Sequence, residues 1–226
     1  MKSRLAALSA GLISLWIAVA SPAAHIYHHL LTGHMVQHLL LMVVAAPLVL
    51  IASGSNALLG RSLPAALCWL AGSLTVIFWH VPEVLAVTLR SNYWHAIEQF
   101  SFFVAGILFW KPAIANATRG SDWSVPVYLF LATLPCDALS AYLVFCDHIV
   151  YPSYRSGGQL FRLSPLDDQA LAGALMWVFV TFAYLIPALV LSARLLSSER
   201  TDAAANPGDL EAGAGYGDIS TSAADR

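Results

Sequence analysis

The stretch from Leu5 to Gly60 reads LAALSAGLISLWIAVASPAAHIYHHLLTGHMVQHLLLMVVAAPLVLIASGSNALLG and contains no Lys, Arg, Asp or Glu. About 20 apolar residues in a helix are enough to cross a bilayer, so this stretch is long enough for two crossings. Ser21 and Pro22 divide it into two apolar runs, because Ser-Pro pairs favour turns. The stretch therefore predicts a membrane protein whose first two spans lie near the N-terminus.

The composition of the whole chain indicates the same environment. Hydrophobic residues make up 58% of the 226 residues and charged residues 11%, whereas an ordinary soluble domain has roughly 25% charged residues. The net charge of −2 provides no basic excess for nucleic acid, and three cysteines do not make a disulfide framework. These counts exclude a soluble globular domain, a disordered chain and a nucleic-acid binder. We expect an all-α fold, a polytopic transmembrane helix bundle with about six spans.

Gaps between charged residues set the expected spans. Lys2 and Arg4 precede the first run, which ends in small residues, so a cleaved signal peptide is the alternative to an uncleaved anchor. We divide the chain into an anchor or signal-peptide-like helix over residues 1–20, a bundle over 21–196 and a disordered tail over 197–226. The six expected helices are Leu5–Ala20, His34–Ile51, Pro64–Val81, Tyr93–Ile114, Val125–Asp147 and Asp168–Leu191.

Positive charges indicate the orientation in the membrane. Six spans place both termini on one side, and most of the Lys and Arg residues fall on that side. The positive-inside rule therefore predicts that both termini are cytoplasmic. The larger group is Lys2, Arg4, Arg61, Lys111, Arg119, Arg194, Arg200 and Arg226; the smaller group is Arg90, Arg155 and Arg162.

Histidine is the most informative residue type in the chain. In this topology all eight histidines lie at or near the face opposite the termini, and the cytoplasmic loops and tail have none. Imidazole is a common ligand for copper, zinc, iron and haem, so this placement indicates a metal site on the outer side. The eight are His25, His28, His29, His34, His38, His80, His95 and His148.

Helical spacing selects some of these histidines as candidate ligands. His34 and His38 are four residues apart, and His95 and Glu98 are three apart, so each pair shares a helical face. A carboxylate within a bilayer is costly unless it is partnered, so Glu98 should face the bundle interior. His80 ends the third span at the same level. We expect one metal site from these residues, although interfacial histidines can also lie at headgroup level without a metal.

The start of the last span adds two candidate ligands. Asp168 can be a ligand, or it can be a cap, since acidic side chains favour helix N-termini. Gln169, Gly173 and Met176 follow at helical spacing and form a polar-to-sulfur stripe toward the bundle, in which Met176 is a candidate ligand; packing is the alternative role for the stripe. Asp137, deep within the fifth span, is a further functional-site hypothesis, because ionisable residues within membranes usually mark function.

Several blocks of sequence are shared with a known family. The first two are HMVQHLLLM at residues 34–42, which runs on to APL at 46–48, and DQALAGALMW at residues 168–177. Further pieces are WHVP at 79–82, His95 with Glu98, FW at 109–110 and YPSY at 151–154. In this order they resemble the CtaG family of caa-type cytochrome c oxidase assembly factors. The likeness covers His25 to Leu191, and Gln99 stands where the family often has a second histidine.

The resemblance implies a polytopic protein, in the plasma membrane of a bacterium, that is needed to assemble a haem-copper oxidase and that aids copper insertion from the outer face. Copper is the implied metal, and the implied partners are cytochrome c oxidase subunits and a copper chaperone. The histidines that match the family are His34, His38, His80 and His95, with Gln37, Asp168 and Gln169 as polar neighbours. Soft donors for copper could be Met35, Met42 or Met176.

Three other function classes are compatible with the sequence. His38 and His95 could be the axial ligands of a b-type haem in an electron-transfer protein. HIYHH at residues 25–29 has the form of a di-iron hydroxylase box, but such enzymes need several boxes and we find one. A metal-free scaffold for oxidase subunits is the third class. The chain has no nucleophile–base triad and no phosphate-binding motif, so we expect no enzymatic activity.

Overall fold

The structure, a computed structural model, describes residues 2–21, 29–53, 63–119, 123–155 and 162–205, and every regular element within these ranges is a helix. Five helices are long and apolar enough to span a membrane, and one bent pair of helices makes a sixth span if it is counted as one. The prediction of an all-α polytopic bundle with about six spans is confirmed. The elements are α1 (Lys2–Val19), α3 (Leu31–Leu39), the π-helix η1 (Leu40–Ala45), α4 (Ala46–Ser53), α5 (Ala65–Trp79), α6 (Pro82–Thr88), α7 (Asn92–Arg119), α8 (Ser124–Phe145), the 3-10 helix η2 (Pro152–Tyr154) and α9 (Pro165–Ala205).

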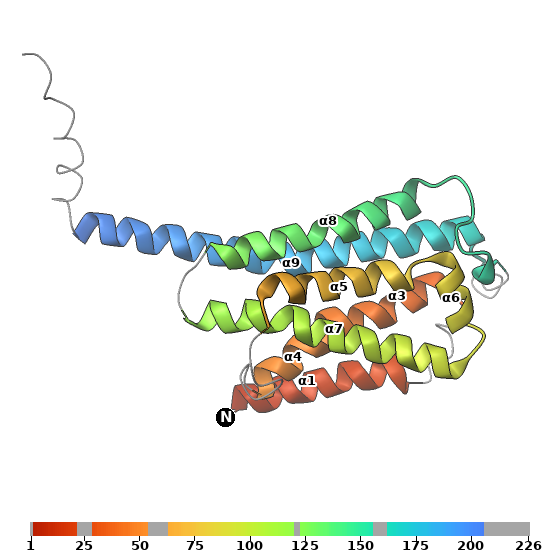
Figure 1. Cartoon of the computed structure of the whole chain (residues 1–226), viewed down its shortest axis with the longest axis horizontal. Helices are drawn as coiled ribbons and strands as arrows, with labels where there is room; N and C mark the ends of the chain where they lie inside the picture. The colour runs from red at the N-terminus through yellow and green to blue at the C-terminus, as the bar shows by residue number, and fades with distance from the viewer. Residues whose placement is uncertain (1, 22–28, 54–62, 120–122, 156–161, 206–226) are drawn as a thin grey trace, which may run out of the picture.

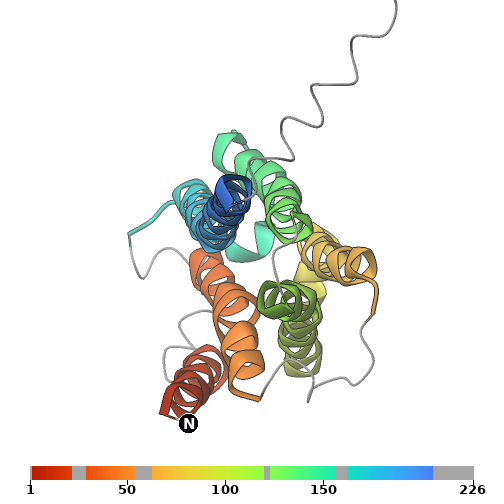
Figure 2. The ribbon, with the colours of Figure 1, turned by 90° about the vertical axis from the view of Figure 1, so that its left-hand side faces the viewer.

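Consecutive spans run in opposite directions, so the connections alternate between the two ends of the bundle (Figure 1). The helix α1 lies at the edge, where it packs against η1 and α4, while α8 and α9 form a pair on the other side (Figure 2). The helix α3 contacts both α7 and α9, and α7 contacts α5. This packing brings the first turns of α3, α7 and α9 and the last turn of α5 to the same end.

The second span contains a π-helical segment at its centre, η1. At its end the Ala46 N–H bonds to the carbonyl of Leu41, five residues back. Pro47 explains the irregularity, because proline has no N–H to donate and its ring clashes with the carbonyl four residues earlier. The wider π turn relieves this clash, and it leaves the Met42 carbonyl without its helical donor. The Trp110 indole N–H donates to that carbonyl at 3.1 Å, so the irregular backbone is paired.

The third span bends by 78° where α5 meets α6. Pro82 is the first residue of α6, a position where a helix needs no N–H donor. His80 lies in the bend, and its backbone N–H bonds to the Val76 carbonyl at 3.2 Å. The sequence predicts one helix over Pro64–Val81, and the structure adds to it a short helix that turns across the end of the bundle (Figure 1).

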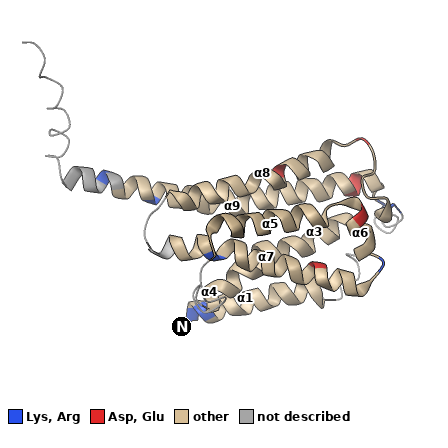
Figure 3. Cartoon of the chain, in the orientation of Figure 1, with Lys and Arg blue, Asp and Glu red and all other residues tan. Residues whose placement is uncertain are grey.

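Charged side chains are distributed unequally along the bundle (Figure 3). Most Lys and Arg residues gather at the end where α1 begins and α9 ends, whereas Asp and Glu lie toward the end where α3 and α7 begin. The histidines in the described ranges lie at or near this second end, on α3, on α7, in the α5–α6 bend and in the connections. The one-sided placement of histidine therefore holds for them, while His25 and His28 lie outside the described residues.

Several predicted helix bounds differ from the structure, and α7, for example, continues to Arg119 rather than Ile114. The helix α9 continues to Ala205, whereas the sequence predicts a disordered tail from residue 197. The segment from 199 to 205 contains Glu, Arg and three Ala residues, which favour helix. Between residue 199 and Pro207 the chain has no Gly or Pro that would end the helix. The helix α8 ends at Phe145 rather than Asp147. The rest of the predicted tail, 206–226, lies outside the described residues.

Gly106 determines how closely α7 approaches the second span. A Cβ atom added at this glycine would lie 2.8 Å from Ala46 Cβ and 2.8 Å from the Met42 carbonyl oxygen. Separations this short are repulsive in a close-packed interior, so glycine permits a helix spacing that alanine does not. Glu98 lies about two turns before Gly106 on α7, so this contact also sets how far Glu98 is from α3.

We expect Gly106→Ala to destabilise the folded protein. One extra methyl group in a packed interface typically costs about 1–3 kcal/mol, which should lower the thermal unfolding midpoint of the detergent-purified protein. The matched control is Ala96→Val, which adds methyl groups to an exposed position on the same helix. The control should unfold at the wild-type midpoint. An unchanged midpoint for Gly106→Ala would contradict this account of the helix spacing.

Candidate metal centre

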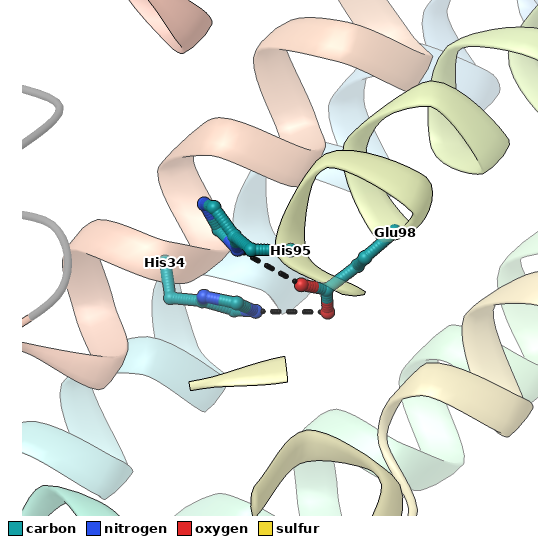
Figure 4. A group of neighbouring side chains, drawn as sticks. All are labelled: His34, His95 and Glu98. Carbon is teal, nitrogen blue, oxygen red and sulfur yellow. Dashed lines mark hydrogen bonds and ion pairs between the residues drawn. The ribbon is translucent and has the colours of Figure 1, made fainter. Parts of the chain in front are cut away.

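The Glu98 carboxylate lies among three imidazole rings. Its Oε1 atom is 3.1 Å from His34 Nε2 and 3.3 Å from His38 Nε2, and its Oε2 atom is 3.2 Å from His95 Nδ1. Figure 4 shows two of these contacts, in which His34 and His95 each approach a different oxygen atom of the carboxylate. We call His34, His38, His95 and Glu98 the His–Glu centre.

Helix geometry explains why these side chains meet. His34 and His38 lie one turn apart on α3, with ring centroids 4.3 Å apart, and His95 and Glu98 lie one turn apart on α7. Because α3 packs against α7, the two pairs face each other. His34 and Glu98 are both 0% exposed. A carboxylate that has lost its hydration in this way depends on the surrounding imidazoles for its polar contacts.

Gln99 orients the ring of His95, a role that the sequence reasoning missed. Its amide nitrogen Nε2 lies 2.6 Å from His95 Nε2. An amide N–H that donates to Nε2 leaves the His95 proton on Nδ1, and this proton is then donated to Glu98. The only signal in the sequence was that Gln99 replaces a histidine expected from the family resemblance.

Two ring nitrogens of the His–Glu centre have no hydrogen-bond partner within the described part of the chain. They are His34 Nδ1 and His38 Nδ1. Buried polar atoms are nearly always hydrogen-bonded, so buried imidazole nitrogens without a partner point to a bound ligand. Imidazole nitrogen and carboxylate oxygen together suit copper, zinc or iron. The residues present therefore fit a transition-metal ion.

His80 lies beside the His–Glu centre but does not contact Glu98 in the same way. Its Nδ1 donates to the Val76 carbonyl at 2.7 Å, and its Nε2 faces the sulfur of Met35 at 3.1 Å. Its ring centroid is 5.9 Å from that of His38. The single four-histidine site expected from the sequence is therefore divided, with three rings gathered on Glu98 and the fourth directed at a thioether.

A cavity of about 50 Å³ lies between the helices next to these rings. His38 and His80 both line it. Met176, a predicted ligand, also lines this cavity rather than joining the His–Glu centre. The volume is enough for a water molecule or an ion, and it is far below the roughly 300–1,000 Å³ of pockets that hold organic ligands.

Asp168 holds the start of α3 instead of facing the imidazoles. Its Oδ2 accepts the Leu31 N–H at 2.7 Å, and its Oδ1 accepts the N–H and the hydroxyl of Thr32 at 3.1 and 2.7 Å. A helix is usually capped by the residue just before it, but here the capping carboxylate comes from α9. The predicted alternatives were a ligand and a cap of its own helix. The geometry instead makes Asp168 a cap of α3, which positions His34 one turn later.

Gln37 and Gln169, the other polar residues implied by the resemblance, tie helices together. The Gln37 amide donates to the Ala18 carbonyl at 2.9 Å, which links α3 to α1. The Gln169 carbonyl oxygen accepts the Val150 N–H at 2.8 Å, and its amide donates to the His148 carbonyl at 3.2 Å. These bonds hold the connection after α8 against α9.

Two tyrosines in that connection cover the end of the bundle. The Tyr154 ring centroid lies 6.2 Å from that of His34, and the Tyr151 hydroxyl donates to a backbone carbonyl in the α5–α6 bend at 2.9 Å. Both side chains are buried. Burial raises the pKa of the Tyr154 hydroxyl, and the nearby Glu98 and Asp168 carboxylates raise this pKa further. Tyr154 therefore stays neutral. The YPSY motif marked this segment, but the sequence did not show that it covers the histidines.

Other candidate residues lie apart from the centre. Cys146, Asp147 and His148 form a more accessible group, in which His148 Nδ1 is 3.2 Å from Cys146 Sγ and 3.2 Å from Asp147 Oδ1. Water can compete for these exposed side chains.

Asp137, which the sequence suggested as a functional residue within the fifth span, accepts a 3.4 Å hydrogen bond from the Thr181 hydroxyl on α9. A bond of this length is weak, and it adds little to the extensive packing of α8 against α9.

A comparison with protein families gives a match that covers most of the chain. The family described as "Cytochrome c oxidase caa3 assembly factor (Caa3_CtaG)" matches residues 1–198. No curated protein and no solved structure matches the chain. The family match extends on both sides of the segment from His25 to Leu191, which carries the resemblance in the sequence.

We expect Asp168→Ala to lower the stability of the protein without removing its metal ligands. The N–H groups of Leu31 and Thr32 lose their acceptor, and an unpaired buried donor costs about 1–3 kcal/mol. Thermal unfolding should show this loss, while a copper titration at saturation should give the wild-type stoichiometry. The control, Asp167→Ala, removes a neighbouring but exposed carboxylate and should have a smaller effect. Lost copper binding at unchanged stability would make Asp168 a ligand instead.

Proposed function

Because the chain belongs to the family of cytochrome c oxidase caa3 assembly factors, we propose that it aids assembly by holding copper at the His–Glu centre and passing it to an oxidase subunit. Copper is the cargo in this role. It is bound by side chains and released in the same oxidation state, so no bond of a substrate is made or broken. The role is that of a metal chaperone and not that of an enzyme.

The observation that carries the proposal is the burial of one carboxylate among three imidazoles. An ionisable side chain inside a membrane bundle is costly and is usually kept for a function. Packing alone does not need His34 and His38, since leucine would fill the same space without leaving nitrogen atoms unpaired. Imidazole is a suitable ligand for copper, as it is for zinc, iron and nickel. Together with the oxidase family, this favours copper as the metal.

We place the His–Glu centre on the outer side of a bacterial plasma membrane. Most Lys and Arg residues lie at the opposite end of the bundle (Figure 3), and the positive-inside rule puts that end in the cytoplasm. Both termini are then cytoplasmic. A copper chaperone on the outer side would supply the metal, and the recipient oxidase subunit would approach from the same side or within the membrane.

The arrangement suits a site that fills and empties. His34 and Glu98 are 0% exposed, whereas His38 and His95 are 5% and 7% exposed, so these two rings are the first that a partner can reach. Without copper, the imidazole N–H groups can donate to Glu98 and keep the carboxylate paired. The side chains that bind the metal thus also stabilise the copper-free protein, and little rearrangement is needed between the two states.

The alternative of a b-type haem is less compatible with this geometry. The two expected axial ligands, His38 and His95, are both directed at Glu98, with ring nitrogens 3.3 and 3.2 Å from its carboxylate oxygens, and the neighbouring cavity is about 50 Å³. A porphyrin needs a pocket of several hundred Å³ between its axial ligands.

The di-iron alternative depended on His25, His28 and His29. The first two lie outside the described residues, and the third is exposed.

The proposal predicts that the His–Glu centre is needed for copper in the oxidase. A strain that lacks this protein would be complemented with the wild-type chain, with Glu98→Gln or with His34→Ala/His95→Ala. Both variants should lower oxidase activity and oxidase copper content to the level of the deletion strain, and added copper should restore activity in part. The purified variants should bind less copper than the wild type.

The matched control for these variants is His29→Ala, which removes an exposed histidine at the same end of the bundle. It should behave as the wild type in every assay. A metal-free scaffold makes the opposite prediction, because Glu98→Gln protein that is present in the membrane at the wild-type level would then support full oxidase activity and copper content. That result would overturn the copper role.

A further inference from the structure

The sulfur atoms of the chain are concentrated around one cavity. Of the four methionines, one is Met1 and the other three all line the cavity of about 50 Å³ next to His38 and His80. Cys136 adds a thiol to the same wall. These residues come from α3, η1, α8 and α9, so distant parts of the chain bring sulfur to one place. We call this space the sulfur-lined cavity; its methionines are Met35, Met42 and Met176.

Two electron-pair donors face each other at the edge of the sulfur-lined cavity without a proton between them. The Val76 carbonyl can only accept, so the proton of the His80 ring is on Nδ1, which lies 2.7 Å away. In the neutral ring Nε2 then carries a lone pair, and it points at the Met35 sulfur at 3.1 Å. A thioether has no proton to donate either. A cation that both atoms can bind would turn this unfavourable contact into a favourable one.

The irregular second span places Met42 in the cavity wall. This residue lies in the π-helical segment η1, and π segments occur frequently at functional sites. Gly72 on the facing helix leaves room for it, since a Cβ atom there would lie 3.3 Å from Met42 Cε. Trp110 holds the Met42 backbone carbonyl at 3.1 Å. The backbone is therefore held while the flexible thioether remains able to adjust.

His38 belongs both to the His–Glu centre and to the wall of the sulfur-lined cavity. Its Nε2 is 3.3 Å from Glu98, and its ring also lines the sulfur-lined cavity, stacked on Phe102 at 3.7 Å between centroids. The side chain is buried, and its Nδ1 atom has no hydrogen-bond partner within the described ranges. A ring placed in this way can pass an ion from one set of ligands to the other by a small displacement.

We propose that the sulfur-lined cavity is a second metal site, selective for Cu(I), with the thioethers of Met35, Met42 and Met176 and the imidazole of His80 as its ligands. This inference rests on the proposed function for the identity of the cargo. Thioethers are soft ligands, and soft ligands favour Cu(I). Cu(I) moves between the His–Glu centre and the cavity through His38 and stays Cu(I), so no electron is transferred.

The simpler role for these methionines is filling space, since methionine adapts to irregular cores. The two roles differ in what copper contacts. Selenomethionine can replace methionine throughout the chain without any mutation, and three of the four labelled positions line the cavity. X-ray absorption at the copper edge of the purified full chain, loaded anaerobically with Cu(I), should then show copper–selenium scattering. Scattering from light atoms alone would overturn the inference.

Variants separate the two sites. Met42→Leu/Met176→Leu should remove most of the selenium scattering and weaken Cu(I) binding at least tenfold in competition with a Cu(I) chelator. Leu39→Val alters another residue of the cavity wall without removing a sulfur, and it should keep both properties. Glu98→Gln should lower the copper stoichiometry from two to one and retain the copper–selenium signal.

The same measurements distinguish failure of this inference from failure of the proposed function. If copper binds only light atoms and Glu98→Gln abolishes the binding, the His–Glu centre stands and the cavity site is wrong. If copper–selenium scattering is present but Glu98→Gln changes neither the stoichiometry nor oxidase assembly, the cavity site stands and the proposed function of the centre is wrong.

Discussion

The rest of the structure depends on one carboxylate that must be stabilised inside a helix bundle. Glu98 is 0% exposed, so its charge is compensated by the imidazoles of His34, His38 and His95 rather than by water. Those contacts require α3 and α7 to approach closely, with their first turns at the same end. The glycine at position 106 permits the approach, and the cap supplied to α3 by another helix sets where that helix begins.

Irregular backbone surrounds the candidate centre, and each irregularity is paired with a side chain that stabilises it. Pro47 causes the π turn in the second span, and Trp110 takes up the carbonyl that this turn releases. Pro82 starts α6 after the α5–α6 bend, and Tyr151 donates to a carbonyl in that bend. The two irregular segments carry Met42 and His80, which both line the sulfur-lined cavity.

The donor atoms are sorted by chemical type into two adjoining places. Nitrogen and carboxylate oxygen form the His–Glu centre, while thioether sulfur lines the sulfur-lined cavity beside it. In the role that we propose, the protein captures a metal and also releases it, and two adjoining sets of donors with different preferences suit both steps. His38 is the side chain that the two sets share.

The sequence by itself determined the fold class, the end of the bundle at which histidine gathers, and the two helical pairs that meet at Glu98, because hydropathy and helical spacing are local properties of the chain. It could not decide that Asp168 caps α3, that His80 faces Met35, or that Gln99 orients His95. These are choices among partners on different helices or among equally polar neighbours. Only the tertiary packing decides them, because it determines which groups lie within about 3 Å of each other.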